Sequence, residues 1–441
     1  MLVLLMGTHL YFTVRLGFIQ RRVPDGIRWS FGGRKIKEEE THTPSAVHRS
    51  QPYKTASGGV SAYSALATAL AATIGTGNII GISTAIALGG PGAVFWCWIS
   101  GLLGMATCYA ECFLAVRYRV HREDGSLVGG PMYILDKILH YKGLAVIFSV
   151  FAILAAFAAG SSVQAHSMAA AIREQIDISP HLIGIGAGML AGTVIIGGAK
   201  KISKVCTWMV PVMSIFFLAG CAVVIWQNRH FLPQTFAAIV GAAFSARSFI
   251  GGMAGTAVMT ALRVGMAKGL FTNEAGMGSM PMSAAAADTQ SPKRQAIVSM
   301  TGVFWDTIVM CAVTGITIVS SLLKNPEIFA GAAQDRLCFI AFSTLPWNGE
   351  LMLSVCLVLF SFATIVGWSF YGECAAHYLG GERGTKLFQI AYMVFVYLGA
   401  VMSLEMVWNL SDLCNAFMTL PNMVCLWALR KVVIKESRCD V

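Results

Sequence analysis

Long apolar runs dominate this sequence and set the strongest limit on its fold. Several of them extend over about 18 residues or more, the length a helix needs to cross the hydrocarbon core of a bilayer. Only helices and closed barrels satisfy their backbone polar groups there, and a barrel would show short alternating segments. With 56% hydrophobic and only 12% charged residues, the chain is predicted to be an all-α polytopic membrane protein.

Eleven apolar segments can be placed along the chain. The first is too short for a core that needs about 20 residues, so we expect an incomplete helix or further residues before Met1. The segments cover residues 2–14, 61–86, 92–118, 144–173, 181–199, 205–226, 236–262, 297–322, 347–378, 387–407 and 413–429.

Basic residues are distributed unevenly between the loops that join these segments. With the N-terminus placed outside, the predicted cytoplasmic loops hold 27 Lys and Arg and the external loops hold four. Because Lys and Arg concentrate on the cytoplasmic side, this bias predicts eleven crossings of the cell (plasma or inner) membrane, with the C-terminus in the cytoplasm. The bias also accounts for the net charge of +10, so no nucleic-acid partner is predicted.

Two segments are interrupted by glycines near their middle. Gly75-Thr76-Gly77-Asn78 lies in segment 61–86, and Gly251–Gly255 lies five segments later. Interrupted spans at corresponding positions point to the binding site of a secondary transporter, and here they predict an inverted repeat of five helices plus five. The predicted parts are an N-terminal helix with a basic loop, two repeats and a cytoplasmic tail, at residues 1–60, 61–226, 236–429 and 430–441.

An unwound stretch inside a membrane helix has chemical consequences. Hydrocarbon cannot satisfy the freed N–H and C=O groups, so they must face protein, ligand or water. The N-terminus of a half-helix favours a carboxylate, and freed carbonyls favour a small cation. A zwitterionic amino acid with Na⁺ meets both demands, and Asn78 is the side chain in the stretch able to reach both. For Gly251–Gly255, tight helix packing is an equal alternative.

Four stretches resemble the alanine or glycine:cation symporter family: GTGNIIGISTAIALGGPGAVFWCWISGLLGMATCYAE (75–111), GGPMYIL (129–135), KGLFTNEAGMGSMP (268–281) and GWSFYGE (367–373). The resemblance covers almost the whole chain. It implies the leucine-transporter type of fold, in which an inverted five-helix repeat carries one extra N-terminal helix. It also implies Na⁺-coupled uptake of alanine or glycine by alternating access.

The break at Gly75–Asn78 is also similar to the first broken helix of neurotransmitter:sodium symporters. That likeness implies that carbonyls of Ala71 and Ile74 face a sodium ion. It implies that the backbone from Thr73 through Gly75, Thr76 and Gly77 holds the substrate carboxylate.

Polar side chains inside other segments complete the predicted site. Gln164 can donate to and accept from a zwitterion, and the hydroxyls of Ser361 and Thr364 share one helix face, suited to Na⁺. Family members typically carry a threonine where this chain has Ala363, which leaves the ion itself open. Trp368, one turn beyond Thr364, is expected to limit the pocket or to pack in the core.

The second broken helix is expected to supply Gly252, and Phe271 if its register shifts inward. Arg247 on that helix is a candidate for an extracellular gate, and snorkelling of its side chain to the membrane interface is an equal alternative. Glu111 and Glu373 are expected near the cytoplasmic ends, paired with Arg117, Arg119 or Arg263 at an inner gate. Glu274 lies in a glycine-rich stretch just inside the inner boundary, a second unwound stretch or a gate hinge.

No Walker A, GxSxG or HExxH motif occurs, and the twelve cysteines show no metal-ligand spacing. The sequence therefore predicts no enzyme and no cofactor besides co-transported Na⁺. The leading hypothesis is a symporter of a small neutral amino acid. Proton coupling through Glu111 or Asp306, and a non-transporting sensor or channel, stay open, as do the choice of amino acid and the oligomeric state.

Overall fold

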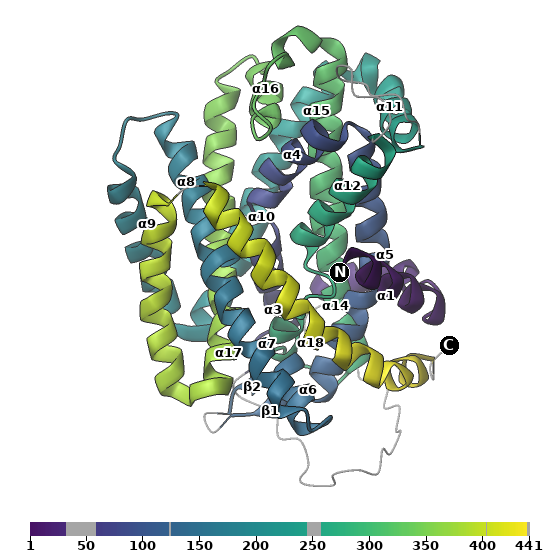
Figure 1. Cartoon of the computed structure of the whole chain (residues 1–441), viewed down its shortest axis with the longest axis vertical. Helices are drawn as coiled ribbons and strands as arrows, with labels where there is room; N and C mark the ends of the chain where they lie inside the picture. Colours follow the sequence, from purple (N-terminus) through teal and green to yellow (C-terminus); the bar gives the residue numbers. More distant parts are fainter. Residues whose placement is uncertain (32–58, 123–124, 245–256, 403, 439–441) are drawn as a thin grey trace.

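Figure 1 shows a computed structural model of the chain, which describes residues 1–31, 59–122, 125–244, 257–402 and 404–438. Helices make up almost all of it. They are α1 (Leu2–Arg15), α2 (Val23–Phe31), α3 (Ala62–Thr73), α4 (Ile80–Gly89), α5 (Gly92–Arg117), α6 (Pro131–Lys137), α7 (Lys142–Ala155), α8 (Val163–Arg173), α9 (Pro180–Ile195), α10 (Gly198–Gln227), α11 (Leu232–Phe244), α12 (Ala257–Asn273), α13 (Met280–Ala285), α14 (Pro292–Val303), α15 (Ala312–Lys324), α16 (Leu337–Ser343), α17 (Gly349–Val401) and α18 (Leu404–Arg438).

Six continuous helical stretches in the described part of the chain are long and apolar enough to cross a membrane, and up to eight if each of two bent pairs forms one span. The bent pairs are α1 with residues 19–31, turned by 69°, and α3 with residues 76–89, turned by 59°. The second pair is the predicted segment 61–86, broken where the sequence placed the break. Residues 245–256, which include Gly252 and Arg247, lie outside the described residues.

The structure adds three details to the expected segments. The segments 347–378 and 387–407 both lie in α17, which consists of two helical stretches joined at a kink, where Gly381 leaves helical geometry with φ 58° and ψ −146°. Residues 430–438 belong to helix α18. A short antiparallel ribbon joins β1 (Val120–His121) to β2 (Leu127–Val128), with Val120 opposite Val128.

Two π-helices interrupt long spans. The π-helix Ala156–Ser162 joins α7 to α8, and the π-helix Phe304–Cys311 joins α14 to α15. A π-turn shifts the register of the residues that follow it and often marks a functional site. Here the two π-helices contribute groups to the surroundings of the broken pair.

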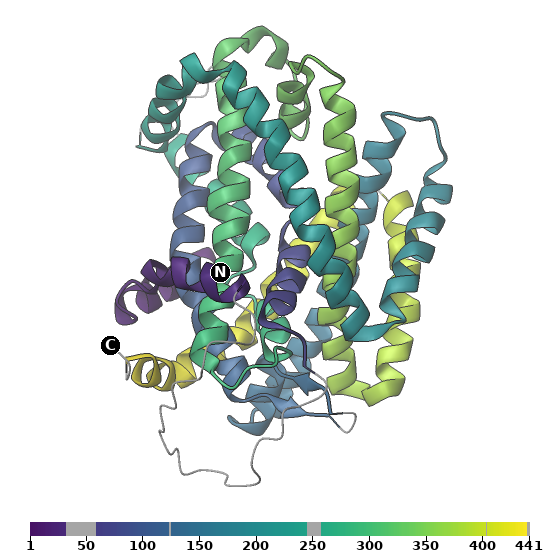
Figure 2. The same cartoon turned by 180° about the vertical axis from the view of Figure 1, so that it is seen from behind.

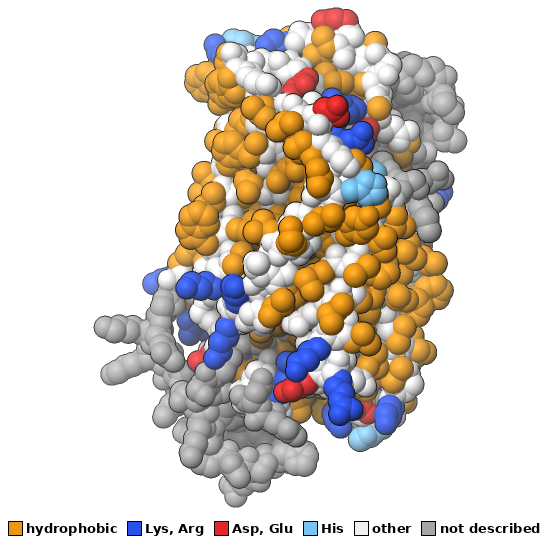
Figure 3. Space-filling model, turned by 90° about the vertical axis from the view of Figure 1, so that its left-hand side faces the viewer, with side chains coloured by type: hydrophobic (Ala, Val, Ile, Leu, Met, Phe, Trp, Pro, Cys, Tyr) orange, Lys and Arg blue, Asp and Glu red, His pale blue; other side chains and the backbone are white. Residues whose placement is uncertain are grey.

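The broken pair α3–α4 occupies the middle of the bundle. Figures 1 and 2 show α8, α9 and part of α17 on one side of it, and α5, α14 and α1 on the other. Apolar side chains cover the middle of the face in Figure 3, while charged side chains gather toward its two ends. Large exposed side chains such as Leu182, Met189 and Trp208 are those expected of a lipid-facing belt.

Small residues allow α17 to lie directly on the broken helix. A Cβ added at Gly367 would stand 2.6 Å from the backbone nitrogen of Ala72. Membrane helices use glycine in this way to bring their backbones together. This close approach positions Thr364 and Trp368, on the same helix, beside the break.

We predict that Gly367→Ala destabilises the protein by about 1–3 kcal/mol, the usual cost of overpacking a close contact. The melting temperature of purified protein in detergent measures this. Gly380→Ala on the same helix is the matched control, because a Cβ there meets no atom within 4 Å. Equal melting temperatures for the two variants would contradict the close approach.

Candidate functional site

The break has a defined backbone geometry. Helix α3 ends at Thr73, Ile74 and Gly75 adopt extended conformations, and a 3-10 turn at Thr76–Asn78 leads into α4. A side chain at Gly75 would stand 2.6 Å from Thr364 Oγ1 and 3.3 Å from Gln164 Oε1. The glycine therefore lets the break lie against two other helices.

Side chains satisfy the backbone groups that the break sets free. The Gly75 N–H donates to Asn78 Oδ1 at 2.9 Å, and the Thr76 N–H points to Gln164 Oε1 at 3.4 Å. On the other side, Thr364 Oγ1 donates to the Ile74 carbonyl at 3.4 Å. The last two contacts are long for hydrogen bonds.

Asn78 lies behind the break and holds it to the π-helix Phe304–Cys311. Its Nδ2 donates to Asp306 Oδ1 at 2.8 Å and to the Asp306 carbonyl at 3.2 Å. Thr307 Oγ1 donates to the second carboxylate oxygen of Asp306 at 2.8 Å. Asn78, which was predicted to reach the substrate and the ion, thus makes its hydrogen bonds within the protein.

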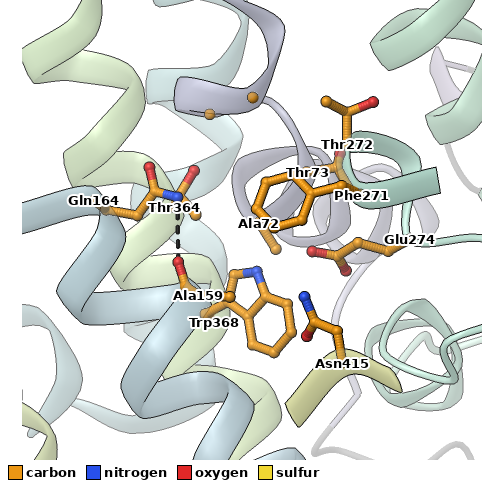
Figure 4. Close-up of a pocket in the computed structure, with 12 residues that line it drawn as sticks. Ala72, Thr73, Ala159, Gln164, Phe271, Thr272, Glu274, Thr364, Trp368 and Asn415 are labelled. Atoms are coloured by element: carbon orange, nitrogen blue, oxygen red, sulfur yellow. Dashed lines mark hydrogen bonds between the residues drawn. The ribbon is translucent and has the colours of Figure 1, made fainter. Parts of the chain in front are cut away.

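A small pocket lies at the break (Figure 4). Residues that the sequence analysis singled out line it together with others that it did not. The predicted substrate and ion residues among them are Thr73, Gly75, Gly77, Gln164, Phe271, Thr364 and Trp368, and Glu274 was singled out as a second unwound stretch or a gate hinge. The additional ones are Ala72, Ala159, Thr272 and Asn415.

Two of the predicted walls depend on the π-helix Ala156–Ser162. Gln164 Nε2 donates to the Ala159 carbonyl at 3.2 Å, five residues back, as Figure 4 shows. A Cβ at Gly160 would stand 2.4 Å from Trp368 Cβ, so glycine leaves the space in which the indole lies. Trp368 is almost fully buried, at 3% exposed.

Oxygen groups gather where α3 meets α17. Ile74 contributes its carbonyl beside Thr364, and Ala71 lies in the same contact, since a Cβ at Gly367 would be 3.0 Å from its carbonyl carbon. The buried Ser361 hydroxyl, three residues before Thr364, has no hydrogen-bond partner among the described residues. Three of the four residues predicted to hold Na⁺, Ala71, Ile74 and Thr364, therefore lie in one helix contact.

Other predicted residues lie outside the pocket. Thr76 directs its backbone N–H toward Gln164, and its hydroxyl is buried without a partner among the described residues. The expected ion pairs of Glu111 and Glu373 are wrong: Glu111 accepts from Asn422 and Glu373 accepts from Gln389. Amide partners satisfy a buried carboxylate without burying a second charge. Arg117 instead pairs with Glu436, and Arg119 donates to the Ala287 carbonyl.

Asn415 is a pocket residue that sequence reasoning missed, although polar side chains inside apolar spans are rare and usually functional. Glu274 was expected in a stretch that either reaches the substrate or forms a gate hinge, and it lies in the pocket. The positions of the two residues depend on how α12 packs against α4 and α5 and how α18 packs against α7.

This arrangement defines a class: a multi-pass membrane transporter with a small solute pocket at a broken helix. Comparison with protein families matches residues 1–439 to the sodium:alanine symporter family, and the chain belongs to it. It is therefore a transporter and not an enzyme.

Individual relatives agree with this assignment. An uncharacterized transporter of Haemophilus influenzae is 42% identical over 99% of this chain and 92% of its own length. The sodium/alanine symporter AgcS of Methanococcus maripaludis is 40% identical, over 99% and 93%.

Solved structures share the fold. A Na⁺-coupled sialic acid symporter in a substrate-bound outward-open state aligns with a TM-score of 0.57 and 14% identity, over 97% of this chain and 87% of that one. A manganese transporter of Eremococcus coleocola aligns with a TM-score of 0.51 and 14% identity, over 86% and 81%.

We predict that Asn78→Ala destabilises the protein by about 1–3 kcal/mol, because it leaves the Gly75 N–H and the Asp306 carboxylate without their partner. In a double-mutant cycle with Asp306→Asn, the coupling energy should be about 0.5–3 kcal/mol, measured by unfolding in mixed micelles.

Asn228 provides the control, since its amide donates to Ser320 and Ser321 on α15 and not to Asp306. The cycle of Asn228→Ala with Asp306→Asn should be additive. Additivity in both cycles would show that Asn78 does not hold the break to the π-helix.

Proposed function

We propose that this protein is a secondary active symporter that couples inward movement of Na⁺ to uptake of alanine or glycine. The observation that carries the proposal is the pocket at the break, where polar backbone and amide groups face the apolar walls of Phe271 and Trp368. A zwitterion with a very small side chain fits such a lining. AgcS, the sodium/alanine symporter that is 40% identical to this chain, supports the same choice.

Each end of the substrate has a partner in this proposal. The substrate carboxylate lies at the break, where the N–H of Thr76 has only a long contact at 3.4 Å and can turn to the ligand. Gln164, which lines the same pocket, binds the zwitterion through its amide. Trp368 and Phe271 cover the side chain of the substrate and leave no room for a larger one.

Sodium takes the adjoining oxygen groups: the carbonyls of Ala71 and Ile74 and the hydroxyls of Ser361 and Thr364. Neutral hard oxygens suit Na⁺ in the way that they suit other hard cations. The membrane potential contributes about 2.3 kcal/mol per charge for each 100 mV. One Na⁺ therefore supports roughly a fifty-fold substrate gradient at that voltage, since 1.4 kcal/mol corresponds to about tenfold.

The proposal includes the architecture in which this coupling operates. Residues 61–226 and 236–429 form two inverted five-helix repeats after an N-terminal helix, with eleven crossings, the N-terminus outside and the C-terminus in the cytoplasm. The centrally placed bent pair α3–α4 and the charge bias of the loops support this layout. Alternating access then exposes the pocket to each side in turn.

Uptake of labelled alanine into proteoliposomes with an imposed Na⁺ gradient tests the function. We expect accumulation that requires Na⁺ and rises with an inside-negative potential, and its loss in Asn78→Ala protein that stays folded in the membrane. Uptake that ignores Na⁺ and follows pH would overturn sodium coupling. Binding without accumulation would indicate a sensor.

The sodium site makes a separate prediction. Thr364→Ala should raise the Na⁺ concentration for half-maximal uptake by about tenfold, equivalent to roughly 1.4 kcal/mol for one lost ligand. Thr364→Ser keeps the hydroxyl and should stay close to the wild type, while Ala363→Thr adds an oxygen and should lower the Na⁺ requirement. An unchanged Na⁺ dependence in Thr364→Ala would remove this residue from the site.

A further inference from the structure

One wall of the pocket carries a carboxylate to which the proposed function gives no role. Glu274 is the only acidic residue among the described residues that line the pocket, and it is 3% exposed. In Figure 4 its carboxylate points toward the cavity, between Phe271 and Asn415. A carboxylate in such a place is costly unless a positive group or several donors meet it.

The backbone holds this side chain in an unusual way. Helix α12 ends at Asn273, and Glu274 adopts φ 54°, a left-handed conformation that residues other than glycine rarely take. Its N–H still donates to the Leu270 carbonyl at 3.1 Å, while its own carbonyl accepts from the Met277 N–H at 3.1 Å. The chain thus turns sharply at this residue, and the turn sends the side chain into the pocket.

The described side chains supply this carboxyl group with hydrogen bonds but with no cation. Ser279 Oγ donates to Oε2 at 2.5 Å, and the Trp368 indole is a second hydrogen-bonding partner. The charged groups that act on it are the carboxyls of Asp306 and Glu111. Among the described residues, Glu274 takes part in none of the ion pairs with Lys or Arg. The pocket therefore presents a carboxyl group whose ionised form has no cationic partner among the described residues.

The remaining walls indicate which cation fits. The break offers an anion the backbone N–H of Thr76, whose contact with Gln164 is long at 3.4 Å, and Glu274 lines the pocket at the same break. An α-amino acid carries its carboxylate and its ammonium on one carbon, and the ammonium has three hydrogens to donate. Glu274 gives that end of the ligand the charged acceptor that Gln164 and Thr364 cannot provide.

We propose that Glu274 binds the ammonium group of the substrate and so selects α-amino acids over monocarboxylates and hydroxy acids of equal size. This inference rests on the proposed function, because it requires the pocket to bind an amino acid. Alanine and lactate differ in one respect that matters here: lactate has a hydroxyl where alanine has the ammonium. Their affinity ratio therefore measures the contribution of the Glu274 charge.

Binding of labelled alanine to purified protein in saturating Na⁺, displaced by unlabelled alanine, lactate or propionate, tests the inference. We expect the wild type to prefer alanine strongly. Glu274→Gln keeps the size and a Ser279 contact but removes the charge. Alanine affinity should fall by about 30-fold or more, as for truncating one partner of a buried ion pair, whereas lactate and propionate affinities should not fall. The preference for alanine over lactate should then collapse.

Glu373→Gln is the matched control, since this buried carboxylate on α17 accepts a hydrogen bond from Gln389 and does not line the pocket. It should keep the wild-type ratio. Glu274→Asp covers poor folding of the glutamine variant: it keeps the charge and should keep the preference for alanine with weaker binding.

A failure of this inference can be distinguished from a failure of the proposed function. A wild-type ratio in Glu274→Gln overturns the inference and leaves the proposed function standing. The inference also fails if the ratio is unchanged but the pH profile of uptake shifts, which would assign the carboxylate to a coupled proton. Wild-type protein that binds neither alanine nor glycine rejects the proposed function itself.

Discussion

The structure depends on one constraint, which is that backbone groups freed inside a membrane must find partners. The break between α3 and α4 frees several of them, and each partner comes from a different place: Asn78 for the Gly75 N–H, Gln164 on α8 for Thr76, and Thr364 on α17 for Ile74. Because hydrocarbon offers no substitute, these segments must converge on the break. The contacts that satisfy the freed backbone groups of the broken helix therefore also form the polar pocket.

The helices can approach the break this closely only where glycine leaves no side chain in the contact. Gly75, Gly160 and Gly367 each lie where a Cβ would stand less than 3 Å from a neighbouring helix. The π-helix Ala156–Ser162 adds a residue to the turn that presents Gly160 and Gln164, so both face the break. The cavity stays small because these contacts bring Trp368 against α8, and that limits the proposed substrate to a small amino acid.

Features that depend on a single segment could be predicted from the sequence. Predictions failed where the position of a residue depends on how distant segments pack together. The break follows from its glycines, and Thr364 and Trp368 follow from helical spacing, so all were predictable. Asn78 was expected in the pocket, but its amide bonds to Asp306, more than two hundred residues away. Glu274 and Asn415 enter the pocket through the packing of α12 against α4 and α5 and of α18 against α7. The expected arginine partners of Glu111 and Glu373 failed for the same reason.

Under the proposed function, electrostatics links the two bound species. In the role proposed for Glu274, its carboxylate is ionised against the substrate ammonium, and a zwitterion adds no net charge that would offset it. Na⁺ at the neutral oxygens of Ala71, Ile74, Ser361 and Thr364 supplies the missing positive charge, and burial makes an unbalanced charge costly. The loaded pocket approaches neutrality only when the ion is present. The substrate is then held most tightly with Na⁺ bound, which is the thermodynamic condition for coupling.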